Sequence, residues 1–372
     1  MLALYLLGEI LSFLHNATNT MTVFRPWKYL FTLSFPLMVL IAFQLKGLFS
    51  WLPFVYAYVM IPLLELFIPA DSRNMSKAEE ALVMDDPIYD WMVYIMVPLQ
   101  FTFLGYFLWL VTNVPLELYE LMGLISAMGI MCGVYGINVG HELGHRRKPF
   151  ERVLAKMALL TSMYMHFFIE HNRGHHKNVS TPEDPASARF GEVVYTFWFR
   201  TIIDSYRSAW RLEAERLKRK KLAFFSLHNE MIRYQLIQLG FLALIFSIFG
   251  LRTMVIFLNT ALIGILLLET VNYIEHYGLS RKKNANDQYE RTMPHHSWNS
   301  NHVIGRLLLF ELSRHSDHHY IASRKYQVLR HFDDTPQMPT GYPGMMLLSL
   351  VPPLWFKVMH PKIKEVEASL AA

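Results

Sequence analysis

Six long apolar stretches constrain the fold of this chain more than any other feature of its sequence. Each is close to the roughly 17–25 residues that a helix needs to cross a bilayer, and together they contain only two charged side chains, Glu65 and Glu269. The whole chain is 17% charged, against roughly 25% in soluble domains. We therefore predict an all-α integral membrane protein with six transmembrane helices. They are expected at Tyr29–Leu45, Leu48–Ile68, Trp91–Thr112, Leu121–Val139, Tyr234–Phe249 and Met254–Ile274.

The positive charges lie almost entirely on one side of the predicted membrane. If the N-terminus, residues 70–90 and 140–233 and everything after 275 share that side, only Lys46 and Arg252 of the 35 lysines and arginines lie opposite. The positive-inside rule makes the crowded side the cytoplasm. The chain then divides, as one functional unit, into an interfacial helix with transmembrane helices 1–4 (1–139), a cytoplasmic segment (140–233), transmembrane helices 5 and 6 (234–274) and a cytoplasmic C-terminal segment (275–372).

Three further apolar stretches do not fit the six-helix scheme. Met1–Leu14 is short and carries Glu9, so we predict an interfacial helix rather than a cleaved signal. Met345–Met359 contains two adjacent prolines and is expected on the membrane surface. Val153–Ile169 is long enough to cross, but a crossing there would place the histidines before and after it on opposite faces. We therefore expect a re-entrant or cytoplasmic helix at this stretch.

Nine of the 17 histidines fall into four clusters on the predicted cytoplasmic side, where they would form a histidine-rich helical cap. Residues i and i+4 share a helix face, so each of three histidine pairs at that spacing can coordinate one ion. An adjacent second histidine points about 100° away and can reach a second ion. Nine imidazoles exceed the four ligands of a tetrahedral zinc site and suit two ions. The pairs are His141/His145, His171/His175 and His315/His319, and the remaining three are His176, His276 and His318.

Several polar residues beside these clusters are candidates to orient ring N–H groups and to offset the charge of the ions. The carboxylates are Glu142, Glu170, Asp184, Glu275 and Asp317. Asn272 lies one turn before His276 on the same helix face, where a ligand, an outer-sphere role and a packing amide all remain open. The other eight histidines are interpreted as ordinary core or surface residues.

Other chemistries fit the sequence less well. His141-Glu-Leu-Gly-His145 also matches HExxH, in which Glu142 would be the general base of a zinc protease. Such a site needs one further ligand and would leave seven clustered histidines without a role. The single cysteine, Cys132, excludes an intrachain disulfide and a cysteine-ligated iron–sulfur cluster. Since no GxGxxG fingerprint is present either, a redox enzyme of this sequence would take its electrons from another protein.

With these motifs the chain resembles the membrane-bound alkane 1-monooxygenase family, which is related to membrane fatty-acid desaturases. Arg146 and Ser313 stand where that family often has Lys and Gln, and neither is an expected ligand. The motif that contains His276, Asn272-Tyr-Ile-Glu-His276-Tyr-Gly-Leu279, is typical of alkane hydroxylases rather than desaturases. The motifs are His141-Glu-Leu-Gly-His145-Arg146, Glu170-His171-Asn-Arg-Gly-His175-His176, Leu312-Ser-Arg-His315-Ser-Asp-His318-His319 and Asn272-Tyr-Ile-Glu-His276-Tyr-Gly-Leu279.

The resemblance implies a non-haem di-iron centre, with the nine histidines as ligands, that uses O2 to hydroxylate the terminal methyl of a medium-chain alkane. It implies electrons from rubredoxin, separate or fused, which a rubredoxin reductase reduces in turn. It also implies the bacterial cytoplasmic (inner) membrane, with the active site facing the cytoplasm and membrane lipid around the helices. A related desaturase or aromatic-methyl hydroxylase stays open because the chemistry is shared. No nucleic-acid partner is expected.

Two surfaces complete the sequence-based expectations. Trp51, Tyr58, Trp109 and Tyr135 are candidates for the wall of a substrate cavity, where one large side chain would limit alkane length. The basic run at residues 211–221 is a solvated helix, a patch attracted to anionic lipid, or part of the docking surface for an acidic electron donor.

Overall fold

The computed structural model describes residues 25–370, and in that range the regular elements are helices joined by turns and loops, with two isolated β-bridges. The interfacial helix predicted at Met1–Leu14 lies outside the described residues. The first part contains η1 (Pro26–Leu33), α2 (Ser34–Leu45), η2 (Gly47–Trp51), α3 (Leu52–Val55), η3 (Tyr56–Met60), α4 (Ile61–Phe67), α5 (Lys77–Met84), α6 (Pro87–Tyr94), α7 (Met96–Asn113), α8 (Leu118–Met131), η4 (Cys132–Asn138) and α9 (Val139–Gly144).

The second part holds most of the histidine-rich segments and the C-terminal helices. It contains α10 (Pro149–Leu160), α11 (Phe167–Glu170), η5 (His171–His175), α12 (His176–Asn178), α13 (Val194–Arg219), α14 (Glu230–His276), η6 (Pro294–His296), α15 (Val303–Leu308), α16 (His315–Tyr320), η7 (Tyr326–Val328), α17 (Tyr342–Ser349) and α18 (Pro352–Ser369). The apolar stretch Met345–Met359 is therefore divided between α17 and α18.

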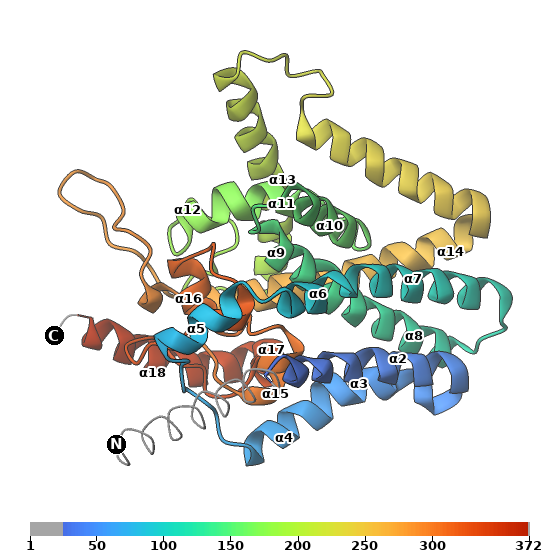
Figure 1. Cartoon of the computed structure of the whole chain (residues 1–372), viewed down its shortest axis with the longest axis horizontal. Helices are drawn as coiled ribbons and strands as arrows, with labels where there is room; N and C mark the ends of the chain where they lie inside the picture. The colour runs from blue at the N-terminus through green and yellow to red at the C-terminus, as the bar shows by residue number, and fades with distance from the viewer. Residues whose placement is uncertain (1–24, 371–372) are drawn as a thin grey trace, which may run out of the picture.

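In the described range, five helices are long and apolar enough to cross a membrane. The first four agree with the first four predicted transmembrane helices, and α2, α3, α7 and α8 run roughly parallel in Figure 1. The fifth, α14, contains both remaining predicted segments. The five are Pro26–Leu45, Gly47–Phe67, Pro87–Asn113, Leu118–Gly144 and Glu230–His276.

Gly250 divides α14 into two arms. Its φ of 81° and ψ of 174° lie in a region that glycine tolerates and L side chains rarely adopt. Figure 1 shows the first arm descending to this corner and the second arm returning along α7 and α8. The predicted short loop at residues 250–253 is thus a sharp bend within one continuous element, which is why five spanning candidates are found rather than six.

The stretch Val153–Ile169 does not form one continuous helix. The 12 residues of α10 end at Leu160, and α11 begins only at Phe167 after a turn. At 1.5 Å per residue, α10 is roughly 18 Å long, which is too short for the ~30 Å hydrocarbon core. Accordingly, this stretch is not among the spanning candidates.

The helix Leu118–Gly144 is the centre of the bundle. Some 78% of its apolar window is buried, against 22–44% in the other four candidates. Glycines let α14 approach it closely, since a Cβ at Gly129 would lie 2.6 Å from Ile263 and one at Gly264 would lie 2.8 Å from Cys132. Because these two helices end at Gly144 and His276, their packing brings two of the histidine motifs to the same end of the bundle.

Candidate metal centre

Four segments carry the nine clustered histidines to one end of the bundle. Their ring nitrogens form two groups, and within each group the potential ligand atoms all lie within 4.8 Å of one another. Among the described residues these are the two groups with metal-binding side chains at such spacing. The first group is His141, His145, His171, His176 and His318, and the second is His175, His276, His315 and His319.

In the first group the Nε2 atoms form a chain of close contacts. The Nε2 atom of His318 lies 2.9 Å from that of His141 and 3.1 Å from that of His176. The Nε2 atom of His171 lies 3.0 Å from that of His176 and 3.1 Å from that of His145. Five imidazoles from three separate segments therefore point their Nε2 atoms toward one point.

These contacts cannot all be hydrogen bonds. An imidazole Nε2 offers either one N–H or one lone pair, yet His171, His176 and His318 each have two Nε2 neighbours. A single cation satisfies all the lone pairs at once. With metal–nitrogen bonds of about 2.1 Å, ligands at right angles lie roughly 3.0 Å apart and tetrahedral ligands roughly 3.4 Å apart. The observed spacing fits an ion with more than four ligands.

The second group has four fully buried histidines. The Nε2 atoms of His175 and His319 lie 3.2 Å apart, and those of His276 and His315 lie 3.3 Å apart. The Oε2 atom of Glu275 lies 3.1 Å from the Nε2 atom of His315, so one carboxylate also reaches this group. Four imidazoles with a carboxylate beside them are a donor set suited to a first-row transition metal.

The motif Glu170-His171-Asn-Arg-Gly-His175-His176, called histidine box 2 from here on, is divided between the two groups differently from the predicted pairing. His171 belongs to the first group together with His176, whereas His175 belongs to the second, so the prediction that His171 and His175 grip one ion is wrong. The reason is that η5 is a π-helix, in which the backbone N–H of His176 bonds the carbonyl of His171. Residues five apart share a face in a π-helix, whereas the i,i+4 rule holds for an α-helix.

The electrostatics of the site keep most of these imidazoles neutral. Burial, reinforced by neighbouring imidazoles, lowers the pKa of His171, His176 and His318 well below the ordinary value. A neutral imidazole is the form that binds a metal. His175 differs: burial is the largest influence and lowers its pKa, but the carboxylates of Asp184, Glu170 and Glu275 together outweigh burial and raise the pKa above its ordinary value.

Among the predicted outer-sphere residues, Asp184 and Glu275 contact histidines. The Oδ2 atom of Asp184 lies 2.8 Å from Nδ1 of His175 and also accepts a hydrogen bond of 2.6 Å from Ser187. Glu275 lies beside His315, and its Oε1 atom accepts a hydrogen bond of 2.7 Å from the hydroxyl of Tyr342. Each carboxylate is thus held by a hydroxyl on one side while it faces an imidazole on the other.

The other four residues contact different partners. Glu142 pairs with Arg146 at 2.6 Å, and Asp317 pairs with Arg324 at 2.6 Å, so neither carboxylate bonds a ring N–H as expected. The Asn272 amide donates to Glu269 at 3.0 Å. Glu170 is buried with its Oε1 atom unpartnered, and burial raises its pKa to about 8. Glu142 and Asp317 are therefore held in ion pairs, whereas Glu170 and Asn272 lie in a small cavity with His171 and His175 but make no hydrogen bond to either ring.

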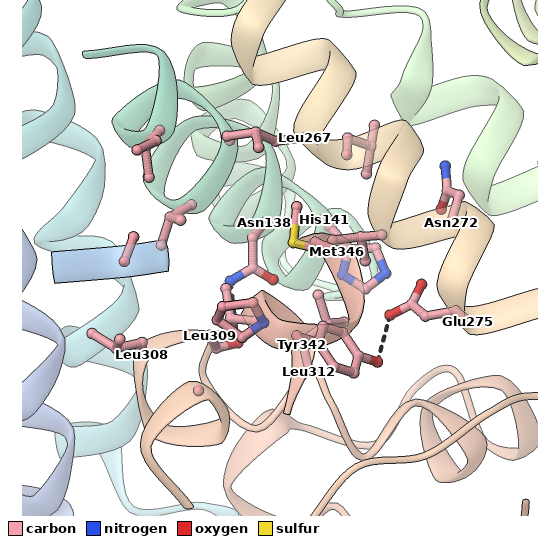
Figure 2. Close-up of a pocket in the computed structure, with 18 of the residues that line it drawn as sticks. Asn138, His141, Leu267, Asn272, Glu275, Leu308, Leu309, Leu312, Tyr342 and Met346 are labelled. Carbon is pink, nitrogen blue, oxygen red and sulfur yellow. Dashed lines mark hydrogen bonds between the residues drawn. The ribbon is translucent and has the colours of Figure 1, made fainter. Parts of the chain in front are cut away.

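A narrow apolar cavity of about 110 Å³ ends at the histidines. His141 and His171 of the first group and His315 of the second line its inner end. Figure 2 shows Asn138 and Met346 near His141, and the hydrogen bond between Tyr342 and Glu275 beside them. The apolar lining includes Ile130, Val134, Phe167, Leu267, Leu268, Val271, Leu308, Leu309, Leu312 and Met346.

Of the four aromatic residues expected in the cavity wall, only Tyr58 lines it. Trp51 donates to the carbonyl of Tyr119, Trp109 is 50% exposed, and the hydroxyl of Tyr135 donates to the carbonyl of Thr32. Asn138 was not among the predicted site residues, although it lies one turn before His141 on the same helix and lines the cavity. Tyr342 was not predicted either, because no local sequence pattern connects it to the histidines.

Comparisons with known proteins agree with this arrangement. The sequence profile of the fatty acid desaturase family matches residues 118–349. The chain is 41% identical over 311 residues to an alkane 1-monooxygenase from Acinetobacter baylyi, covering 84% of this chain and 76% of that protein. It is 42% identical over 316 residues to alkane 1-monooxygenase 2 from Pseudomonas aeruginosa, covering 84% of each. It is 30% identical over 336 residues to the hydroxylase component of a xylene/toluene monooxygenase from Pseudomonas putida, covering 88% of this chain and 86% of that protein.

Proposed function

This chain belongs to the alkane 1-monooxygenase family, and from that premise we propose that it hydroxylates the terminal methyl of medium-chain alkanes at a non-haem di-iron centre. The reaction consumes one alkane, one O2, two electrons and two protons, and yields one primary alcohol and one water. Two iron ions held by the nine histidines would supply the O2 activation and electron acceptance that no side chain of this protein provides.

The observation that carries the proposal is the cavity that touches both histidine groups. A chain methyl at its inner end would lie beside His141, His171 and His315, between the two metal positions. The remaining lining is mostly aliphatic, so it excludes water and holds an apolar chain without requiring a polar headgroup. Asn138, whose amide donates to the carbonyl of Leu309 at 3.1 Å, lines the cavity next to His141.

The donor set favours iron over a structural zinc ion. Structural zinc prefers four ligands in a tetrahedron, whereas the first group offers five imidazoles at spacings that fit right angles. The protease alternative is also disfavoured. Glu142 is buried in ion pairing with Arg146 and accepts the backbone N–H of Tyr326 at 3.3 Å, so it is not free to act as a general base.

We propose that the chain crosses the bacterial inner membrane six times, with the centre facing the cytoplasm. The reversal at Gly250 supports two crossings by α14, because its arms are 20 and 26 residues long on either side of that residue. The charge asymmetry, with Lys46 and Arg252 as the only basic residues on the opposite side, supports the orientation.

The proposed electron donor is rubredoxin, docking where the centre comes nearest to the surface. His145 and His176 are the two histidines of the centre that are only partly buried. Arg147, Lys148 and Lys177 next to them are exposed in the structure. A basic rim beside the most accessible ligands suits an acidic one-electron carrier, because transfer needs a short distance and opposite charge speeds encounter.

Octane hydroxylation by the iron-loaded protein tests the function. Purified protein with ferrous iron, rubredoxin and its reductase should convert octane to 1-octanol, and products are identified by gas chromatography. Octene as the main product would instead indicate a desaturase, and faster turnover of xylene at its methyl group an aromatic-methyl hydroxylase. Absence of every one of these products in a protein shown to hold two irons would refute the proposed function.

A further inference from the structure

The segment between α13 and α14 has surface properties that neither the metal centre nor the cavity uses. Residues 218–221 are four consecutive exposed basic side chains. Just after them, Phe225 is 88% exposed and Leu227 is 69% exposed. Figure 1 shows this segment as a tip that projects away from α12 and α16. Exposed apolar side chains next to a row of cations are typical of a surface that sits at a membrane interface.

The tip is also placed correctly for contact with the bilayer. The spanning helix α14 begins at Glu230, only a few residues after Leu227. At 1.5 Å per helical residue, Arg233 lies within about one turn of the start of that helix. With the proposed orientation, the basic residues of the tip therefore face the cytoplasmic leaflet, which carries the anionic lipid headgroups.

A cavity of about 370 Å³ opens beside the tip and has a surplus of positive charge. Four cations line it: Arg173, Arg216, Lys220 and Arg233. Two carboxylates neutralise part of this charge. Glu213 pairs with Arg173 at 3.0 Å and with Arg216 at 2.5 Å, while Glu230 pairs with Arg173 at 2.8 Å and with Arg233 at 3.4 Å.

We propose that this cavity binds the phosphate of an anionic phospholipid, whose acyl chains lie along Leu227 and the first arm of α14. One phosphodiester charge would offset half of the surplus left by four cations and two carboxylates. Leu222 and Leu227 also line this cavity and would contact the acyl chains of a lipid. A free phosphate has no apolar part that could make these contacts. The exposed ring of Phe225 would insert beside the bound lipid.

The bound lipid would contact the element that carries histidine box 2. Arg173 lies in η5 between His171 and His175, and its guanidinium reaches the cavity. An anion bound among Arg173, Arg216 and Lys220 would therefore stabilise η5. The π-helical geometry of η5 places His171 in the first group and His175 in the second. The lipid would act as a positioning ligand and would not touch the substrate.

Thermal unfolding of the iron-loaded protein in neutral detergent tests the proposal, with phosphatidylglycerol, phosphatidylcholine of the same chain length or inorganic phosphate added. Phosphatidylglycerol should raise Tm, and lipid retained on the protein should be detected by native mass spectrometry. Phosphatidylcholine should do neither. An equal shift with both lipids would overturn the proposal, and the same shift with inorganic phosphate alone would assign the cavity to a free anion instead.

A charge-neutral variant provides the second readout. Lys220→Gln with Arg233→Gln should weaken phosphatidylglycerol binding by about 30-fold, because each basic residue near an anionic surface contributes about 1 kcal/mol. Both side chains are exposed, so folding should be preserved. Lys282→Gln with Lys283→Gln, in an exposed loop elsewhere, is the matched control and should bind as the parent protein does. Unchanged binding in the first variant would refute the site, and this outcome is independent of whether the protein hydroxylates octane.

Discussion

The Nε2 atoms of His141 and His318 lie 2.9 Å apart, although 177 positions separate the two residues in the sequence. His141 lies in the last turn of the central helix of the bundle, and His318 lies on the short helix α16. No local pattern holds them together. The contact exists because the C-terminal segment folds back beneath the bundle, where Glu311 accepts hydrogen bonds from Tyr29 and Lys28 at 2.8 Å each. A metal ion between these segments would connect the central helix of the bundle to the C-terminal part of the chain.

Metal content is the first test of the centre. The purified protein should hold close to two irons per chain, and His141→Ala or His319→Ala should each lose iron together with activity, because each removes a ligand from a different group. Metal is counted by inductively coupled plasma mass spectrometry. His302→Ala is the matched control, since His302 lies outside both groups and should keep both irons. One zinc per chain in the parent protein would contradict the di-iron centre.

Asp184 should control how tightly the second ion is held. Its carboxylate fixes Nδ1 of His175 at 2.8 Å, so Asp184→Asn should weaken iron binding at one site by roughly 10–100-fold while the other site stays loaded. Metal titration with a competing chelator measures the two affinities. Asp204→Asn, which alters an exposed ion pair with Arg207, should change neither. If both sites of Asp184→Asn bound iron as tightly as those of the parent protein, Asp184 would have no role in holding the metal.

Alkane length should depend on the cavity wall far from the histidines. Ile130 lies eleven residues before His141 on nearly continuous helix, or roughly 16 Å along the axis. Ile130→Phe should shift the preferred substrate to shorter alkanes, and Ile130→Ala should extend it. Ile137→Ala is the control, because Ile137 is equally buried in the same helix but does not line the cavity. Both alanine variants should cost about 2–4 kcal/mol of stability, so only the product profile separates them.

A substitution of Glu142 distinguishes the proposed hydroxylase from the alternative zinc protease. Since Glu142 pairs with Arg146 in a buried network that includes Asp90, Glu142→Gln should lower Tm yet leave two irons bound and hydroxylation measurable. Glu151→Gln, at another buried carboxylate, controls for a general loss of stability. Complete loss of turnover in Glu142→Gln with both metals retained would instead favour a general base at this position.

The nine histidines that the structure brings together were predicted from the sequence, because motif spacing is a local property. Their division into two groups could not be predicted, because it depends on a π-helix at His171–His175 that no residue pattern indicates. The cavity wall was predicted from large aromatic residues in the spans, yet Trp109 faces outward and Tyr135 packs toward Thr32. Which face of an all-apolar helix points inward is set by tertiary packing, and a helix that is hydrophobic all round carries little directional information.

Electron delivery should be sensitive to charge at the rim beside His145 and His176. Arg147→Glu with Lys177→Glu should raise the apparent KM for rubredoxin by on the order of tenfold, because steering by exposed charges changes association rates by that order or more. The parent enzyme should also lose donor affinity as ionic strength rises, since the screening length falls to about 8 Å at physiological salt. Iron content must stay at two per chain for the comparison to hold.

The basic run on α13 is the alternative docking surface, and the same assay distinguishes the two. Reversal of Lys218, Arg219 and Lys220 to Glu removes more positive charge, but Figure 1 places that end of α13 away from α12 and its His176. Electron transfer falls steeply with distance, so a donor at the tip would be poorly placed to reduce the centre. We expect the triple reversal to leave the apparent KM for rubredoxin nearly unchanged in neutral detergent. A larger rise in this KM for the triple reversal than for Arg147→Glu with Lys177→Glu would place the docking surface at the end of α13. Turnover that does not depend on salt concentration would exclude electrostatic docking at either place.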